Sequence, residues 1–399
     1  MSDKIQQAEY KNFTVLGVKI KLNKKSFMGV FKRFYYRLTA MPLYRRLLNT
    51  NPAVNKMLPF TAEGYAKCTG GSFDFTVLFN NLKFAPLDDT KTKPDYMFIW
   101  GLGFSPLQKK ALKEAVKYNL PSVVCEDGFL RSADTWANKE MKAKYTQSCS
   151  CVLDDMTTYF DATRASRLEI MLNDKNLVIT PRQKQRAKTL INKITANYLT
   201  KYNHQPIYAP QIGAPGRKKV LVVDQTFADM SIIKGLADEK TFKIMLEKAI
   251  EENPGADIIV KTHPDTMAGT SACYYSNIKQ QGNIYLMNTP INPIALIQYV
   301  DKVYVCTTQL GLEALLCGKE VHTFGMPCYA GWGLTVDYLK CERRANKRSL
   351  EELFYILYIM YTHYINPETK TKCEIEEAID YLLGLRAEYF REFNARCDL

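Results

Sequence analysis

Residues 219–232 read KVLVVDQTFADMSI, and this stretch indicates how the chain folds. The run from Lys219 to Val223 is short and apolar apart from its first residue, which is typical of a buried strand. The polar loop 224–231 follows directly, and a helix is expected around residues 242–252. Strand, polar loop and helix in this order predict one unit of a parallel sheet whose faces are covered by helices.

The same unit recurs on both sides of this stretch. Downstream, strands are expected at residues 258–260, 284–287, 303–305 and 321–324, with a helix at about 311–316. Upstream, strands are expected at 96–100, 122–125 and 151–153, with a helix that begins at Ser105-Pro106 and ends near Tyr118. Pro and Gly residues in segment 200–216 predict a linker between the two series. Two doubly wound α/β halves joined by a linker are typical of two-domain nucleotide-sugar transferases.

The expected fold class is therefore α/β, with two Rossmann-like parallel-sheet domains, a basic helical N-terminal extension and C-terminal helices. Its expected segments are a basic extension packed on the first domain (1–90), the first domain (91–205), the second domain (217–345) and the C-terminal helices (346–399). In the last segment, Ser349 and Glu352 form a capping-box pattern that opens a helix to about His363. A final helix is expected at about 375–393.

Composition excludes several classes of protein. Of the 399 residues, 46% are hydrophobic and 24% charged, which is typical of a folded domain and not of a disordered chain. No apolar run approaches the ~20 residues that span a bilayer, and the polar start MSDKIQQAEYKN predicts no secretory signal. The 11 cysteines lack CxxC pairs, so we expect reduced thiols in the cytoplasm and no metal site.

The net charge of +13 is concentrated near the N-terminus. Eleven Lys or Arg residues and no acidic residue lie between Tyr10 and Ala62. Apolar residues at helical spacing form one stripe in this region: Phe27, Phe31, Phe34, Leu38 and Met41. The opposite face is basic: Lys32, Arg33 and Arg37. One interpretation is a helix packed on the core with a solvated basic face, and the other is contact with anionic membrane lipid or an anionic glycan. No nucleic-acid-binding motif is present, so a nucleic-acid partner is not expected.

Polar residues that suit a phosphate follow two of the expected strands. Thr307 and Thr308 stand between a strand and a helix, where hydroxyl and backbone N–H groups can bind phosphate, although they can equally serve as a helix cap. Lys261 and His263 alternate at another strand end, so both side chains can face one side. Pro264 restricts the turn after them. We expect a phosphate-binding role, and the alternative for His263 is a structural one.

Carboxylates follow two further strands. Glu126 and Asp127 come directly before Gly128 at a strand end of the first half, and Asp224 and Asp229 bracket the polar loop of the second half. Carboxylates that face a cleft can act as nucleophile or base. Spacing alone does not say which of them reacts.

Five motifs in this order carry a family resemblance: LPSVVCEDGFLRS (120–132), VLVVDQTFADMSI (220–232), VKTHPD (260–265), TTQLGLEALL (307–316) and YAGWGLT (329–335). Together they resemble the capsule polysaccharide biosynthesis family of KpsC type, the β-Kdo transferases, and the β-Kdo transferase module of some O-antigen synthases. The resemblance covers about residues 96–366. Bacterial CMP-sialic acid transferases share looser versions of these motifs.

This resemblance implies a GT-B-like architecture, with the first domain on the acceptor side and the second on the donor side. It implies CMP-β-Kdo as donor substrate, no other cofactor, and a product that keeps the β configuration. Two displacements through an enzyme carboxylate give that outcome, and Asp229 matches the residue that resembles the nucleophile. His263 then meets the CMP phosphate, whose charge Lys261, Thr307 and Thr308 share.

The remaining implied roles lie in three other motifs. Glu126 and Asp127 would handle the acceptor proton or order the site, and Arg131 is the candidate for the Kdo carboxylate because a planar guanidinium suits a carboxylate. Gln309 and Glu313 are implied in donor binding, with Glu313 at the ribose hydroxyls. The sugar pocket is assigned to two aromatic residues, Tyr329 and Trp332.

One departure is that family members often carry Thr-Ser where this chain has Thr307-Thr308, which keeps the hydroxyl chemistry. KpsC-type proteins usually contain two such modules and this chain contains one, so we expect a single linkage. The expectation is a cytoplasmic, peripheral inner-membrane β-Kdo transferase that acts on a lipopolysaccharide O-antigen or capsule glycan. The alternatives are another CMP-sugar transferase of sialyltransferase type, or a non-catalytic nucleotide- or glycan-binding module.

Overall fold

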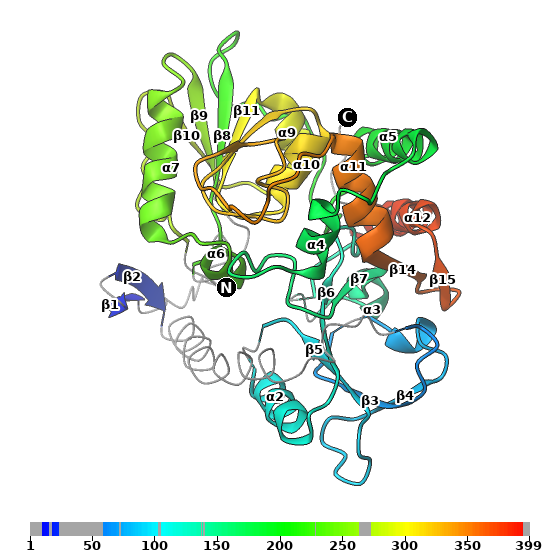
Figure 1. Ribbon diagram of the computed structural model, residues 1–399. Helices are drawn as coiled ribbons and strands as arrows, with labels where there is room; N and C mark the ends of the chain where they lie inside the picture. Colours follow the sequence, from blue (N-terminus) through cyan, green and yellow to red (C-terminus); the bar gives the residue numbers. More distant parts are fainter. Residues whose placement is uncertain are drawn as a thin grey trace, which may run out of the picture.

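The computed structural model describes residues 10–15, 18–23, 59–71, 73–102, 105–136, 138, 140–227, 229–262 and 273–393. Most of these residues belong to two α/β halves, each built on its own sheet. Figure 1 shows the strands β8 to β11 in the upper part of the molecule and β3 to β5 in the lower part. The general prediction of two α/β halves is therefore confirmed.

The second half contains a six-stranded sheet in the order β10-β9-β8-β11-β12-β13. Its strands are β8 (Lys219–Val223), β9 (Asp257–Lys261), β10 (Ile284–Met287), β11 (Lys302–Val305), β12 (Glu320–Thr323) and β13 (Val336–Asp337). All neighbouring strands are parallel, as predicted, and only the short β13 was not expected. The strand order reverses between β8 and β11, which is where Rossmann-like sheets bind ligands.

Helices cover both faces of this sheet (Figure 1). They are α7 (Glu239–Glu251), α9 (Pro293–Tyr299) and α10 (Leu310–Leu316). The short helix α6 (Met230–Lys234), which follows β8, lies beyond the end of the sheet (Figure 1). Val220 and Val222 pack in one hydrophobic cluster with residues of α7, whereas Leu221 and Val223 pack in another with residues of α9 and α10. The alternation along β8 explains why the whole strand is apolar, since each face meets a helix.

The first half contains a seven-stranded sheet in the order β15-β14-β7-β6-β5-β3-β4. Its strands are β3 (Gly64–Cys68), β4 (Leu82–Ala85), β5 (Tyr96–Trp100), β6 (Ser122–Asp127), β7 (Ser150–Asp154), β14 (Thr362–Asn366) and β15 (Thr371–Cys373). The first four pair in parallel, but β7, β14 and β15 are antiparallel to their neighbours. The prediction of a purely parallel sheet is wrong for this half. A parallel crossover usually needs a helix, and the described residues between β6 and β7 form only the four-residue α3 (Ala143–Thr146).

Four helices of this half begin at side-chain caps that the sequence encodes. They are η2 (Phe75–Val77), α2 (Pro106–Tyr118), α4 (Arg167–Asn173) and α5 (Pro181–Ala196). Ser105 and Gln108 form a capping box at the start of α2, where the Ser-Pro pattern predicted a helix. Thr180 and Gln183 do the same for α5, which was not predicted.

The C-terminal segment contributes strands as well as helices. The capping box of Ser349 and Glu352 opens α11 (Leu350–Phe354), which continues as the π-helical segment η3 (Tyr355–Tyr361). The predicted helix to His363 is wrong at its end, because β14 begins at Thr362 and pairs with β7. The final helix α12 (Ile375–Phe393) has the predicted bounds.

Two of the expected segment boundaries also change. Segment 346–399 is not purely helical, since β14 and β15 lie in the first sheet. Segment 1–90 is not a separate extension, since β3 and β4 belong to that sheet too.

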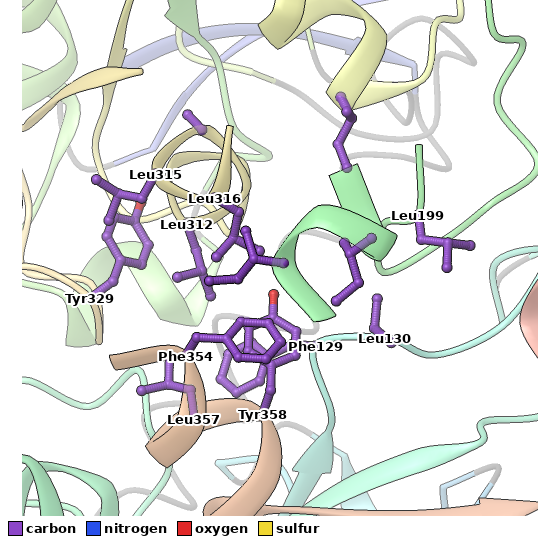
Figure 2. Close-up of a cluster of buried hydrophobic side chains, with 14 of the residues drawn as sticks. Phe129, Leu130, Leu199, Leu312, Leu315, Leu316, Tyr329, Phe354, Leu357 and Tyr358 are labelled. Carbon is purple, nitrogen blue, oxygen red and sulfur yellow. The ribbon is translucent and has the colours of Figure 1, made fainter. Parts of the chain in front are cut away.

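One hydrophobic cluster joins the two halves (Figure 2). It brings Leu312 of α10 together with Phe129, which follows β6, and with Tyr358 of η3. The rings of Phe129 and Tyr358 have centroids 5.1 Å apart. This shared core fixes the carboxyl end of β6 against the helix that follows β11, and so places the strand ends of both sheets near each other.

The described part of the basic N-terminal region is an antiparallel hairpin of β1 (Tyr10–Val15) and β2 (Val18–Asn23). The predicted helix at 27–41, including Lys32, Arg33 and Arg37, lies outside the described residues. Among the helices of the described ranges, none has the length and apolar character needed to cross a bilayer.

Candidate active site between the two sheets

The loops after β8 and β11 are bonded to each other at the strand-order reversal. The backbone N–H of Thr307 donates to Gln225 Oε1 (2.9 Å), and Gln225 Nε2 donates to Thr307 Oγ1 (3.1 Å). Thr308 Oγ1 accepts from the backbone N–H of Leu310 (3.3 Å), which is the cap-like contact that the helix-cap alternative predicts. Both threonines therefore lie at the expected strand end, and both hydroxyls already have protein partners.

Asp224 organises the loop after β8. Its carboxylate is almost completely buried and accepts from the backbone N–H groups of Gln225 (2.8 Å), Tyr274 (3.0 Å) and Tyr275 (3.1 Å). Burial raises the pKa of Asp224, an effect that these hydrogen bonds oppose. A carboxylate held by three backbone donors serves to order the loop and is poorly placed to react.

Asp229 differs from Asp224 in its exposure and in the number of its backbone donors. It is exposed and caps the N-terminus of α6, where its Oδ1 accepts from the backbone N–H and the hydroxyl of Ser231, both at 2.8 Å. Within the described ranges, no donor is bonded to Asp229 Oδ2. Oδ1 thus fixes the orientation of the carboxylate, and Oδ2 is the oxygen that can contact a substrate.

Glu126 lies at the carboxyl end of β6, in the other sheet, and is half-buried. Burial raises the pKa of Glu126 to about 7, with the charge of Lys201 opposing and the charges of Asp127 and Asp229 adding to the rise. Glu126 and Asp229 therefore lie within electrostatic reach of each other, although they come from different sheets. A carboxyl with a pKa near 7 can exchange a proton at neutral pH.

Asp127 and Arg131 form a buried pair beside Glu126. Arg131 Nε lies 2.8 Å from Asp127 Oδ1, and Arg131 Nη1 donates to Ser132 Oγ (2.8 Å) and to the carbonyl of Thr146 (2.7 Å). Only 1% of Arg131 is exposed. These contacts give Arg131 the role of holding Asp127 and the chain after β6, and its burial speaks against direct contact with a sugar carboxylate.

Lys201 is the site residue that the sequence analysis missed. It lies in the segment expected to be a linker, and its carbonyl accepts from the backbone N–H groups of Arg131 (3.1 Å) and Ser132 (3.3 Å). Burial alone would lower the pKa of Lys201, but nearby groups, among them Tyr159, Asp127 and Glu126, raise it above its ordinary value. No motif marks this lysine, because its importance comes only from the strand ends that meet around it.

Glu313 of α10 faces the same lysine from the second half. Burial raises the pKa of Glu313 to about 8, opposed by the backbone N–H of Lys201 and by the side chain of Gln309. Gln309 Nε2 also donates to the carbonyl of Phe129 across the two halves (2.8 Å). Both residues thus help to fix the two halves, and burial favours the neutral form of Glu313.

Tyr329 and Trp332, expected in the sugar pocket, are buried instead. Tyr329 Oη donates to the carbonyl of Thr308 (2.6 Å), and Trp332 Nε1 donates to the carbonyl of Cys328 (2.8 Å). Tyr329 is 1% exposed and Trp332 is not exposed at all. A side chain at Gly311 would collide with the Tyr329 hydroxyl, so this glycine permits the close packing of α10. The two aromatic side chains therefore support the loops of the site from the protein interior and do not line it.

Lys261 ends β9 with its side chain largely buried. Its ammonium donates to the carbonyls of Thr262 and Thr289, both at 3.2 Å. Among the described residues, the third of its N–H donors has no partner. Burial lowers the pKa of Lys261 to about 8. His263 lies outside the described residues. The described residues contain no cluster of side chains suited to hold a metal ion.

Fold and site together define the class: a two-domain α/β protein with carboxylates at the strand ends of both sheets. The second sheet has the kind of strand-order reversal that binds nucleotides. A family model described as capsule polysaccharide biosynthesis protein matches residues 98–368, and the chain belongs to that family.

The relatives support this placement. The chain is 40% identical over 296 residues to the capsule polysaccharide modification protein LipA of Neisseria meningitidis serogroup A, covering 72% of this chain and 41% of LipA. It is 34% identical to the lipopolysaccharide-processing protein LpsZ of Rhizobium meliloti, covering 72% of this chain and 63% of LpsZ. The chain thus matches only part of each of these longer proteins.

A solved structure covers most of the fold. It is described as KpsC of Thermosulfurimonas dismutans, a β-Kdo 2,4 transferase, and is 36% identical with a TM-score of 0.69 over 78% of this chain and 93% of that one. The predicted KpsC-type family is therefore confirmed.

Proposed function

We propose that this chain is a retaining β-Kdo glycosyltransferase of GT-B type, which moves Kdo from CMP-β-Kdo to a glycan through an aspartyl-Kdo intermediate. The observation that carries the proposal is the pair of Asp229 and Glu126. One is an exposed carboxylate with an unoccupied oxygen, and the other is a carboxyl with a pKa of about 7 on the opposite sheet. Such a pair suits a nucleophile and a proton carrier.

In the first displacement, Asp229 Oδ2 attacks the anomeric carbon of Kdo. The bond from that carbon to the CMP phosphate oxygen breaks, and its electron pair leaves with CMP. Lys261 has one unused N–H donor for the phosphate, and His263, Thr307 and Thr308 complete the proposed phosphate contacts. Ser231 holds Asp229 Oδ1 and so limits the rotation of the attacking carboxylate.

In the second displacement, an acceptor hydroxyl attacks the same carbon and gives its proton to Glu126. The bond between the sugar and Asp229 breaks and restores the carboxylate. Two inversions at one carbon leave the β configuration unchanged. Lys201 favours the charged form of Glu126 and so prepares it to accept the proton.

The comparisons support the substrate class. A KpsC structure described as a β-Kdo 2,4 transferase is 36% identical to this chain, and the curated relatives are described as capsule-modifying and lipopolysaccharide-processing proteins. We therefore propose a capsule or lipopolysaccharide O-antigen glycan as acceptor, one linkage type for this single module, and no cofactor beyond the donor substrate.

We further propose that the enzyme works in the cytoplasm at the inner-membrane surface, with its basic N-terminal segment as the contact. Changing Lys32, Arg33 and Arg37 to Gln should then lower binding to anionic vesicles and leave transfer to a short soluble acceptor unchanged. Equal vesicle binding by both forms would favour the packed-helix interpretation.

The functional test is a panel of CMP sugars with short capsule and O-antigen oligosaccharides, with NMR of the product. Transfer of Kdo in β configuration from CMP-Kdo is expected. Transfer only from CMP-sialic acid would favour the sialyltransferase-type alternative. CMP binding without turnover on any donor would favour a binding module.

A further inference from the structure

The helix that carries Asp229 packs against both halves of the molecule. Ile232 is completely buried in the hydrophobic cluster of the second half, with Val220 and Val222 of β8. α6 follows β8 of the second sheet, yet Met230 packs in a hydrophobic cluster whose other members come from the first half, among them Met97, Leu112 and Val124. Met230 is 5% exposed. The start of α6 is therefore seated in the core beside β5, β6 and α2.

The end of α6 is held on the same side by a buried ion pair. The Lys234 ammonium lies 3.2 Å from Asp161 Oδ2, with side-chain exposures of 9% and 0%. The Lys234 carbonyl also accepts from the backbone N–H of Ala162 (2.9 Å). Lys234 thus bonds to the loop between β7 and α4 through both its side chain and its backbone.

Hydrogen bonds within its own loop hold the Asp161 carboxylate in place for this contact. Its Oδ2 accepts from Thr157 Oγ1 (2.8 Å), and its Oδ1 accepts from the backbone N–H of Thr163 (3.1 Å). Arg343 anchors the loop independently, because its Nη2 donates to the carbonyl of Ala162 (2.7 Å). The loop therefore has supports that do not depend on Lys234.

The opposite side of α6 meets the loops of the second half. The carbonyl of Gly235 accepts from the backbone N–H of Met326 (2.7 Å), and a side chain at Gly235 would collide with Thr307. α6 has only five residues, so its two ends are about 8 Å apart at 1.5 Å per residue. A displacement at Lys234 is consequently passed to Asp229 at the other end.

We propose that Asp161 and Lys234 are positioning residues, which clamp α6 to the first half and so fix the position of Asp229 at the N-terminus of this helix. The inference rests on the proposed function of Asp229 as nucleophile. Among the described residues neither Asp161 nor Lys234 is bonded to Lys261, Thr307 or Thr308, and α6 itself reaches Thr307 only through Ser231 (3.4 Å) and Gly235. We therefore expect the clamp to act on Asp229 more strongly than on donor binding.

The test compares Asp161→Asn, Lys234→Met and the double variant Asp161→Asn/Lys234→Met with Asp155→Asn. Asp155 is the matched control because it is as buried as Asp161 (2% exposed each) and also pairs with a cation, Arg167 (2.6 Å), but has no contact with α6 among the described residues. Each single change leaves an unpaired buried group, whereas the double variant removes both and should fold even if the single variants do not.

We expect the double variant to bind CMP as wild type does, within about twofold, and to lose about 10- to 100-fold in kcat, since small misplacements of reacting groups cost this much. Hydrogen exchange at residues 230–235 should increase. The midpoint of the pH–rate profile should move to lower pH, because a displaced Asp229 no longer raises the pKa of Glu126. The charged neighbours of Glu126 are then Lys201 and Asp127. The control should change none of these.

A folded double variant with wild-type kcat, pH midpoint and exchange would overturn the clamp. Failure of the proposed function is visible separately, as a wild-type enzyme that forms no Kdo adduct. The exchange measurement needs no turnover and so tests the clamp in either case.

Discussion

Glu126 at the end of β6 and Asp229 at the start of α6 come from different sheets, yet the charge of Asp229 acts on Glu126 and adds to the rise of its pKa to about 7. Each residue is held by its own local hydrogen bonds. Glu126 Oε1 accepts from the backbone N–H of Asp127 (3.0 Å), and Asp229 Oδ1 accepts from the backbone N–H of Ser231. The pairing thus exists only because the shared core and α6 join the two halves.

The first prediction concerns Lys201. Its positive charge lowers the pKa of Glu126, so Lys201→Met should raise that pKa and move the acid limb of the pH–rate profile to higher pH. We expect kcat at pH 6.5 to fall about tenfold and to recover as the pH rises. Lys201→Arg keeps the charge and should keep the midpoint. The same midpoint in wild type and Lys201→Met would mean that Lys201 does not act on the proton carrier.

The second prediction concerns Lys261, whose pKa burial lowers to about 8. The ammonium loses its proton as the pH passes through this value, so the affinity for CMP should begin to fall between pH 7 and pH 8 and decline further above pH 8. The phosphate is already fully ionised there, since its second pKa is about 6. Lys261→Arg should move the decline to higher pH, and Lys261→Met should remove it. Calorimetric titration with CMP checks this, and a decline that persists in Lys261→Met would assign it to another group.

The third prediction concerns Glu313 and stability. Burial raises the folded-state pKa of Glu313 to about 8, above the ordinary value of 4.5, so the folded state holds a proton that the unfolded state releases. This contribution to stability is complete below about pH 4.5 and is lost as the pH rises to about 8. Urea unfolding of wild type and Glu313→Gln at pH 5 and pH 8 measures it. The free energy of unfolding should fall less with pH in the variant, and an equal fall in both proteins would contradict a neutral Glu313.

Much of the second half could be predicted because its signals are local. Lys219 to Val223 is apolar on both faces, and the polar residues after β8, β9 and β11 mark the strand ends where ligands bind in such sheets. The preference for Asp229 over Asp224 also agrees with the geometry, since Asp224 is bonded to three backbone N–H groups and Asp229 is exposed.

The errors arise where structure depends on contacts distant in sequence. The run from Leu353 to Ile365 looks helical throughout, but β14 begins at Thr362 because it pairs with β7, more than 200 residues away. The sequence also does not show which side chains are buried. Arg131 and Trp332 were therefore expected to face ligands, but both are buried. Lys201 gains its role only from Glu126 and Asp127 of β6 and from Glu313 of α10, two segments that are distant from it in sequence.

The central claim is that Asp229 forms a covalent bond to Kdo, and mass spectrometry of the protein after incubation with CMP-Kdo and no acceptor tests it most directly. Wild type should gain the mass of one Kdo less one water, on the peptide that carries Asp229. Asp229→Ala should lose both the adduct and transfer while still binding CMP, and Glu126→Gln should keep the adduct and transfer slowly. Full transfer by Asp229→Ala, or an adduct mapped to Asp224 or Glu126, would contradict the account.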